Sequence, residues 1–401
     1  MAILSVPLPN RALASRVCHL TSVHPRYDTR IFAKECRSLV HAGFSVTLIV
    51  ADGKGDETRD GVRIVDAGSR RGRLARMLRT TRDVYRKALE VGADIYHFHD
   101  PELIPIGRRL QRRGKRIIYD VHEDVPRQIL GKHYLSPWLR PVVSRLVETY
   151  ENRMIRRFDY VIAAYPYLLK RIEALTPKSC DVTNYPILGD FRGIEARADG
   201  ERAVCYIGSI TRSRGILELI DSLDLADVTL HLGGEFSPPE LRAEVERRPG
   251  WRRVTYHGFV SRPAALAIYS RVRAGIATLH PVGHYPTALA VKMFEYMAAG
   301  LPVICSDFPL WKQIVSEAQC GLTVDPSNPE AIAAGIRHVL SHREEALRMG
   351  RNGRRAVERT YNWGVEEVKL VETYRLLSAP RLAGRASSAG QAGASRTSRA
   401  G

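Results

Sequence analysis

The chain has 401 residues, of which 44% are apolar, so each half is long enough to bury a core of its own. Its six cysteines form no C-x-x-C pair, which argues against a zinc knuckle and against a disulfide scaffold. The formal net charge of +18 indicates an anionic partner: nucleic acid, a membrane surface or a phosphorylated substrate.

The first half alternates short apolar runs with longer amphipathic segments. After a predicted N-terminal extension, residues 1–15, comes the run "RVCHLTSV", then the loop "HPRYDTRIF" and a helix that ends near Gly43. Further predicted strands are "FSVTLIVAD", "GVRIVDAG", "ADIYHFHD", "RIIYDVHE" and "YVIAAYP". This alternation predicts a parallel sheet in an α/β domain over residues 16–184. In its first loop, Arg26 and Arg30 are predicted to reach a phosphate or another anionic group across the cleft.

Two basic segments lie in this half. Arg70–Leu89 carries eight Lys or Arg and one acid beside an apolar stripe, and a second run spans residues 108–116. The first segment fits an anionic membrane surface, or equally a core-packed helix with a solvated basic face. A nucleic-acid binder is disfavoured, because aromatic residues are only 7% of the chain and do not interleave with the basic runs.

Histidines and carboxylates gather at two predicted strand ends. His97, His99 and Asp100 follow one strand, and His122 and Glu123 follow the next. Such a cluster allows an alternative function, a metal-dependent hydrolase that uses His97, His99 and His122. Three ligands would then have to converge from two loops, and the second domain would have no role. We therefore predict no metal.

The second half repeats the α/β pattern. Residues 185–202, rich in Pro, Gly and charge, are the predicted linker, and residues 203–362 form the second domain. A terminal helix over residues 363–379 and a disordered tail over residues 380–401 complete the prediction. In open parallel sheets, ligands bind at the carboxyl ends of the strands, so the chemistry should lie in the loops that follow them.

The most specific motif is "PTALAVKMFEYMAAGLPVICSD", which predicts a helix from about Ala288 to Gly300 and then a strand. Together with "YIGSITRSRGILELI", "VTYHGFVSRPAALAIYS", "HFHDPELIPIG", "YDVHEDVP" and "YNWGVEEVKLVETY", it makes the chain resemble a family 4 glycosyltransferase from Arg16 to Leu377. The resemblance implies a GT-B fold, in which two Rossmann-like domains face each other across a cleft. It also implies that the C-terminal helix crosses back to the first domain.

The resemblance assigns the donor site to the second domain. Glu295 matches the second glutamate of the family's E-x7-E signature and would hold the ribose hydroxyls, while Thr287 replaces the first glutamate and leaves the donor sugar open. Arg214 matches a cation that neutralises the diphosphate. Ser209 replaces the other cation, and Arg212 is predicted to compensate. The whole implied donor-binding set is Gly208, Ser209, Arg212, Arg214, Val260, Thr287, Leu289, Ala290, Val291 and Glu295.

The first domain would supply the reacting centre and the acceptor. His122 matches the histidine that faces the transferred sugar, and it is the predicted catalytic residue. The predicted acceptor-binding residues are Arg26, Arg30, His99, Asp100 and Glu123.

The resulting expectation is a cytoplasmic retaining hexosyltransferase at the inner membrane face, without a cofactor. It would take a UDP- or GDP-sugar donor and a glycan or lipid-linked acceptor, in polysaccharide or surface-glycan biosynthesis.

Overall fold

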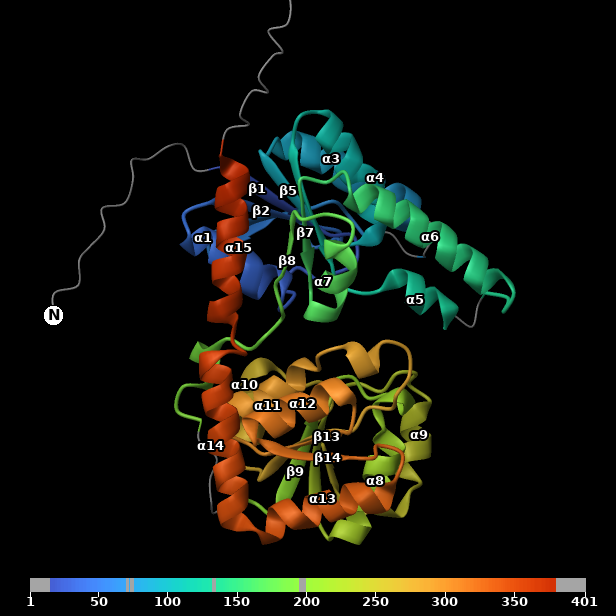
Figure 1. The fold of residues 1–401 in the computed structure, drawn as a ribbon, viewed down its shortest axis with the longest axis vertical. Helices are drawn as coiled ribbons and strands as arrows, with labels where there is room; N and C mark the ends of the chain where they lie inside the picture. The colour runs from blue at the N-terminus through green and yellow to red at the C-terminus, as the bar shows by residue number, and fades with distance from the viewer. Residues whose placement is uncertain (1–14, 70–71, 73–75, 132–134, 195–199, 380–401) are drawn as a thin grey trace, which may run out of the picture.

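The computed structural model describes residues 15–69, 72, 76–131, 135–194 and 200–379. Most of the predicted N-terminal extension, the predicted tail, five residues of the linker and five residues of the basic segment Arg70–Leu89 lie outside this part. The described chain forms two α/β halves, one above the other in Figure 1.

The first half is built on an eight-stranded sheet in the order β3-β4-β2-β1-β5-β6-β7-β8, parallel except for β3 against β4. The strands are β1 Arg16–Leu20, β2 Ser45–Val50, β3 Glu57–Arg59, β4 Val62–Asp66, β5 Ile95–Phe98, β6 Arg116–Val121, β7 Tyr160–Ala163 and β8 Ser179–Asp181. The helices between them are η1 Ile31–Cys36, α1 Arg37–His41, η2 Arg76–Thr80, α3 Thr81–Val91, η3 Pro101–Leu103, α4 Ile104–Arg112, α5 Val125–Leu130, α6 Leu139–Ile155 and α7 Pro166–Glu173.

The second half has a six-stranded, fully parallel sheet in the order β11-β10-β9-β12-β13-β14. Its strands are β9 Ala203–Ile207, β10 Thr229–Gly233, β11 Val254–Tyr256, β12 Ala274–Ala277, β13 Val303–Ser306 and β14 Gly321–Val324. Its helices, with the turn η4 before them, are η4 Leu188–Phe191, η5 Arg212–Arg214, α8 Ile216–Ala226, α9 Leu241–Glu246, η6 Pro249–Arg253, α10 Arg262–Tyr269, η7 Tyr285–Thr287, α11 Val291–Ala298, α12 Pro309–Ala318, α13 Pro329–Ser341 and α14 Arg343–Arg359. The predicted α/β class with parallel sheets is confirmed.

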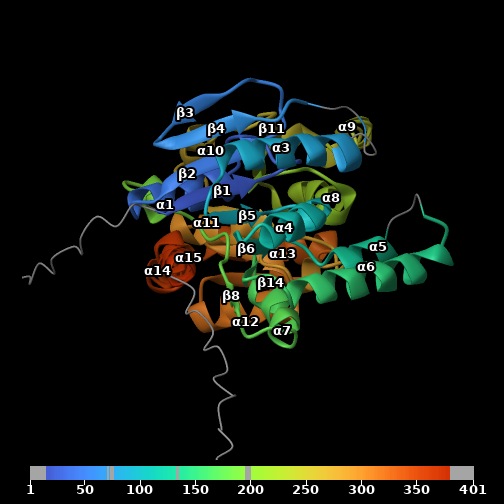
Figure 2. The same cartoon turned by 90° about the horizontal axis from the view of Figure 1, so that it is seen from above.

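The last helix, α15 Trp363–Ser378, returns to the first half, as predicted. In Figures 1 and 2 it continues upward from α14 and lies beside α1. The Trp363 indole Nε1 donates to Ser38 Oγ at 2.9 Å, and the buried Leu370 and Tyr374 belong to the core under β1 and β2. The two halves are therefore joined twice, by the chain near residue 185 and by α14–α15.

Within the described residues, no helix has both the length and the apolarity that crossing a bilayer requires.

Candidate functional site

Both sheets have the doubly wound strand order, which reverses direction at one point. In the first sheet this point lies between β1 and β5, and in the second it lies between β9 and β12. The loops that leave neighbouring strands at such a point separate, which opens a crevice at the carboxyl ends of the strands. Most of the residues predicted to carry chemistry follow these strands or their neighbours.

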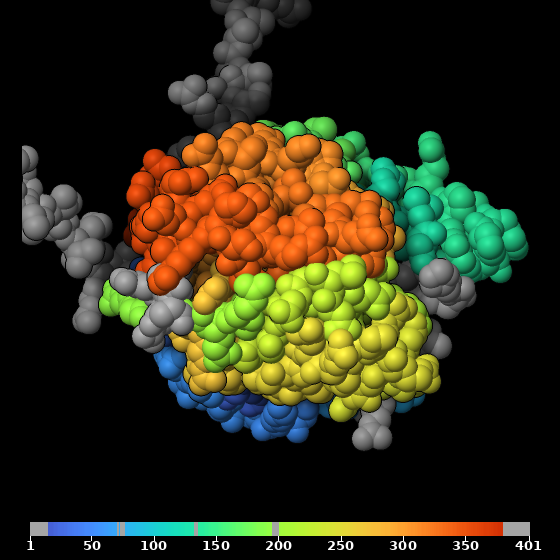
Figure 3. Space-filling view, turned by 90° about the horizontal axis from the view of Figure 1, so that it is seen from below, coloured from blue at the N-terminus to red at the C-terminus, as the bar shows by residue number. Residues whose placement is uncertain are grey.

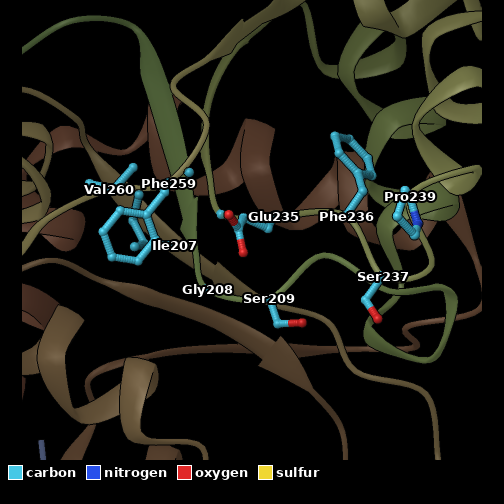
Figure 4. Close-up of a pocket in the computed structure, with 11 residues that line it drawn as sticks. Ile207, Gly208, Ser209, Glu235, Phe236, Ser237, Pro239, Phe259 and Val260 are labelled. Atoms are coloured by element: carbon cyan, nitrogen blue, oxygen red, sulfur yellow. The ribbon is translucent and has the colours of Figure 1, made fainter. Parts of the chain in front are cut away.

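In the second domain, a pocket of about 500 Å³ opens at the carboxyl ends of β9 and β10 (Figure 4). The residues that line it are Ile207, Gly208, Ser209, Gly233, Gly234, Glu235, Phe236, Ser237, Pro239, Phe259 and Val260. Gly234 has φ +141°, and a Cβ there would lie 2.0 Å from the carbonyl oxygen of Gly208. Because glycine has no side chain, the turns at Gly208 and Gly234 can pack against each other, and main-chain atoms form part of the pocket surface.

Two cations flank Gly208. A Cβ built on Gly208 would lie 3.2 Å from Lys292 Nζ and 3.8 Å from Arg214 Nη1. Arg214 Nε and Lys292 Nζ are both buried without a hydrogen-bond partner, and neither side chain forms a salt bridge within the described residues. Burial, reinforced by the charge of Arg214, holds the pKa of Lys292 well below its usual value. Buried donors that lack acceptors are costly, so this corner is suited to an anion.

Lys292 was not predicted from the sequence. Its signal was a lysine at the second position of a mostly apolar helix whose other charged residue is Glu295. In the structure its ammonium group lies 3.3 Å from the centroid of the Tyr206 ring, on the side of Gly208.

The prediction for Arg212 is corrected. Its guanidinium is paired with Glu244 of α9, and its side chain is 58% exposed. At Ser209 this chain lacks the second cation of the family pattern. The basic side chain near that position is Lys292 and not Arg212.

The start of the glutamate-bearing helix is also corrected. α11 begins at Val291, three residues later than predicted, and Thr287 instead ends η7, with its hydroxyl donating to the carbonyl of His284 at 3.1 Å. The indole Nε1 of Trp311 donates to the carbonyl of Ala288 at 2.8 Å, which holds residue 288 in an extended conformation. Between these elements, Leu289 packs against the cores of both domains, so this segment meets the first domain.

Glu295 is the residue expected to hold ribose. Its Oε1 accepts from Arg262 Nη1 at 2.5 Å and its Oε2 accepts from the Tyr269 hydroxyl at 3.1 Å. The side chain is 20% exposed. A carboxylate offers about four acceptor positions, so the two present bonds orient it and leave capacity for a pair of hydroxyls.

In the first domain, Asp100 holds the loop after β1. Its Oδ2 accepts from the Thr21 hydroxyl and from both the amide and the hydroxyl of Ser22, and the residue is only 3% exposed. This loop-holding role differs from the predicted acceptor contact. Glu123 is exposed and accepts from Gln128 Nε2 at 2.6 Å.

Arg26 and Arg30 do not reach into the site as predicted. Both are 5% exposed. Arg26 is bidentate on Asp52 and also pairs with Glu57, while Arg30 is bidentate on Asp120 at 3.0 Å and donates to a backbone carbonyl. Their burial requires carboxylate partners within the fold, which the sequence pattern did not reveal.

His99 and His122 converge on one carboxylate oxygen. Asp120 Oδ2 lies 3.2 Å from His99 Nδ1 and 2.8 Å from His122 Nε2. Burial alone would raise the pKa of Asp120, but the charge of Arg30 overrides it and holds that pKa well below its usual value. Burial lowers the pKa of His99 to about 4, so this imidazole is neutral near pH 7. The His122 side chain is 17% exposed and is the member of the group that solvent reaches.

The trio of His97, His99 and His122 required by the metal-hydrolase alternative does not form. His97 Nδ1 lies 2.7 Å from the Tyr374 hydroxyl, while His99 and His122 meet at Asp120. That carboxylate already carries the Arg30 guanidinium, whose charge opposes a cation beside it.

A second histidine beside His122 was not predicted. The rings of His24 and His122 have centroids 5.2 Å apart. Burial lowers the pKa of His24, but a hydrogen bond to Asp28 and the charge of Asp100 more than offset this and raise it overall. Its signal was its place in "HPRYDTRIF", directly after β1 at the point where strand order reverses.

Comparison with known proteins agrees with this geometry. Residues 29–182 match the family described as "Glycosyl transferase 4-like domain", and residues 190–356 match "Glycosyl transferases group 1". The chain is a family 4-like glycosyltransferase.

Curated relatives of this glycosyltransferase are distant. Glycogen synthase of Mycobacterium tuberculosis is 23% identical over 260 residues, which are 61% of this chain and 60% of that protein. D-rhamnosyltransferase WbpZ of Pseudomonas aeruginosa is 24% identical over 282 residues, 66% of this chain and 69% of that one. The aligned region thus spans only about three fifths of the glycogen synthase's own length.

Solved structures establish the fold of the glycosyltransferase as GT-B. Sucrose-phosphate synthase from Thermosynechococcus elongatus has a TM-score of 0.70 at 17% identity, covering 90% of this chain and 99% of that one. Anabaena Alr3699/HepE, in complex with UDP-glucose, has a TM-score of 0.69 at 13% identity, covering 90% of this chain and 100% of that one.

Proposed function

We propose that the protein transfers a hexose, with retention of anomeric configuration, from a nucleoside-diphosphate sugar to a glycan or lipid-linked acceptor. Polysaccharide or surface-glycan biosynthesis is the proposed setting. The observation that carries the proposal is the corner around Gly208. There Arg214 Nε and Lys292 Nζ are buried without a hydrogen-bond partner, beside a pocket lined partly by glycine backbone.

In this proposal the diphosphate binds beside Gly208. Arg214 would balance the negative charge that grows on the leaving diphosphate as the glycosidic bond breaks, which is the stage at which electrostatic stabilisation counts most. Lys292 would join it once the bound diphosphate raises the pKa of its ammonium group and the amine is protonated. Glu295, oriented by Arg262 and Tyr269, would accept from the ribose hydroxyls. The uracil or guanine ring would lie in the pocket near Val260.

The sugar would extend toward the first domain. His122 would contact it and help to stabilise the positive charge that develops at the anomeric carbon, while the acceptor hydroxyl attacks on the face that the diphosphate leaves. This route needs no carboxylate nucleophile, so the paired-carboxylate scheme of glycosidases is not used. UDP-glucose in the Anabaena structure supports a nucleotide-sugar donor of this class.

A panel of UDP-, GDP- and ADP-sugars in a thermal-shift assay tests the donor assignment. We expect one nucleotide class to raise Tm by several degrees, since ligand at about 100 times its Kd adds about 2.7 kcal/mol and each kcal/mol is worth about 2–4 °C for a domain of this size. Glu295→Gln should halve the shift or more. No shift from any nucleotide sugar would contradict the proposal.

We also propose that an anionic membrane surface is a partner of the first domain. In the described part of Arg70–Leu89, Val84 and Ala88 are buried while Leu78 is 72% exposed. The helix α6 projects sideways in Figures 1 and 3. An exposed apolar row at four-residue spacing begins at its N-cap and continues along it. Its members are Trp138, Val142, Leu146 and Tyr150. Exposed arginines such as Arg145 and Arg153 lie among them, as in interfacial helices.

Vesicle flotation at moderate salt tests this partner. The protein should float with vesicles containing about a third anionic lipid and not with neutral vesicles, because each basic residue near such a surface contributes about 1 kcal/mol. The double variant Trp138→Ser and Leu146→Ser should lower the bound fraction at least threefold. Leu225→Ser is the matched control, since Leu225 is 49% exposed in the second domain. Equal binding by both variants, or none by the wild type, would rule the surface out.

A further inference from the structure

A row of hydrogen-bonded side chains runs from the C-terminal helix to His122. The Tyr374 hydroxyl lies 3.0 Å from His19 Nε2, and His19 Nδ1 lies 3.0 Å from His99 Nε2. His99 Nδ1 then lies 3.2 Å from Asp120 Oδ2, which lies 2.8 Å from His122 Nε2. Every member before His122 is at most 2% exposed. The row joins α15, β1, β5 and β6.

The carboxylate decides where the protons in this row lie. Ionised Asp120 can only accept, so His99 carries its proton on Nδ1 and His122 carries its proton on Nε2. His99 Nε2 is then an acceptor, which requires a proton on His19 Nδ1. His19 Nε2 must in turn accept from the Tyr374 hydroxyl. Each assignment follows from the one before it, because burial lowers the pKa of His19 and of His99 and keeps these two imidazoles neutral.

His97 can be placed in the same scheme, with its Nε2 3.8 Å from Asp120 Oδ2. Since the Tyr374 hydroxyl gives its proton to His19, its oxygen must accept from His97 Nδ1, which lies 2.7 Å away. The other nitrogen of His97 is then a bare lone pair that needs no acceptor. His97 Nε2 is indeed buried without a hydrogen-bond partner.

The contact between His19 and His99 has the length of a direct hydrogen bond, although His19, Glu35, His97 and His99 also bring ligand atoms within 4.8 Å of one another. The rings of His19 and His99 are 18° from parallel with centroids 5.2 Å apart, and their facing nitrogens are 3.0 Å apart.

We propose that Asp120 is a positioning residue for His122 and that the row ending at Tyr374 holds Asp120 in its accepting geometry. The Nε2–H form of His122 leaves Nδ1 as the lone-pair nitrogen that meets the substrate. Any positive charge that His122 gains is balanced by Asp120 behind it. This inference rests on the transfer reaction proposed above, in which His122 contacts the sugar.

The first test reads the proton positions directly and needs no substrate. Long-range ¹H–¹⁵N correlation spectra of ¹⁵N-histidine-labelled protein, with His122→Gln used for assignment, should show His122 protonated on Nε2 near neutral pH. Asp120→Asn should shift His122 toward a mixture of both tautomers. Protonation of wild-type His122 on Nδ1, or stoichiometric zinc bound to His99 and His122, would overturn the proposal.

The second test separates positioning from stability. Tyr374→Phe removes one buried hydroxyl from the row, and Tyr96→Phe is its matched control, because the buried Tyr96 hydroxyl donates to the carbonyl of Ala88 outside the row. Both should lower Tm by similar amounts. Only Tyr374→Phe should lower kcat, by about 3- to 10-fold, the range expected for one lost hydrogen bond, with KM for the donor within twofold.

Asp120→Asn should lower kcat by about 100-fold or more at unchanged donor KM. The Asp120→Asn variant could fail to fold, because Arg30 would lose its charged partner. In that case, the comparison of kcat between Tyr374→Phe and Tyr96→Phe still tests whether the row positions His122. Equal kcat for that pair would overturn the proposal. Failure of the proposed function itself would appear differently, as no turnover with any donor in the wild type, while the tautomer measurement would stand.

Discussion

His122→Ala is expected to lower kcat by about 100- to 10,000-fold while donor affinity stays within about twofold. The imidazole is the partly exposed end of a buried row, and Asp120 fixes its Nε2 at 2.8 Å. The donor is proposed to be held by groups of the other domain, around Gly208 and Glu295. Initial rates of nucleoside-diphosphate release, with the donor chosen by the thermal-shift panel, measure the loss.

Glu123→Ala is the matched control for this change. Glu123 follows His122 on the same loop but is exposed, and its described hydrogen bond is to Gln128 of α5. We expect its kcat to stay within about threefold of wild type. If His122→Ala turns over as fast as wild type at saturating donor, His122 has no catalytic role.

Arg214→Ala is expected to lower kcat/KM by about 100- to 1,000-fold, the range for one lost group that stabilises developing negative charge. The Arg214 Nε is buried without a hydrogen-bond partner, its Nη1 donates to the carbonyl of Ser209 at 3.4 Å, and within the described residues no carboxylate pairs with the guanidinium. Arg214→Lys should recover part of the activity, since charge survives while the planar donor set does not. Steady-state kinetics with varied donor concentration give both quantities.

Arg212→Ala provides a control two residues away on the same turn. Arg212 is 58% exposed and already paired with Glu244. An exposed pair of this kind contributes at most about 1 kcal/mol, so activity should stay within threefold and stability should change little. If both arginine variants lose activity equally, the turn as a whole matters and the specific role of Arg214 is wrong.

Lys292 shows why part of the donor site was not predictable. In the sequence it is one of two charged residues in a mostly apolar helix, and nothing local relates it to Gly208, which lies 84 positions earlier in the chain. Their proximity depends on how α11 packs against the end of β9. Packing between distant segments produces no repeating pattern in the sequence from which it could be predicted. Thr287 illustrates the same limit, because the indole of Trp311 sets where α11 begins.

The sequence by itself determined the α/β class, the two domains with parallel sheets and the order of the motifs along them. Period-2 and period-3.6 patterns and strand-end residues are local, so they can be read directly. Only the tertiary structure decided that Arg26 and Arg30 are buried ion-pair partners and that Tyr374 shares a hydrogen-bonded row with His19, 355 positions away. Such pairs arise from strand order and from the return of α15 to the first domain, and the energy of a buried charge depends on the partner that the fold brings to it.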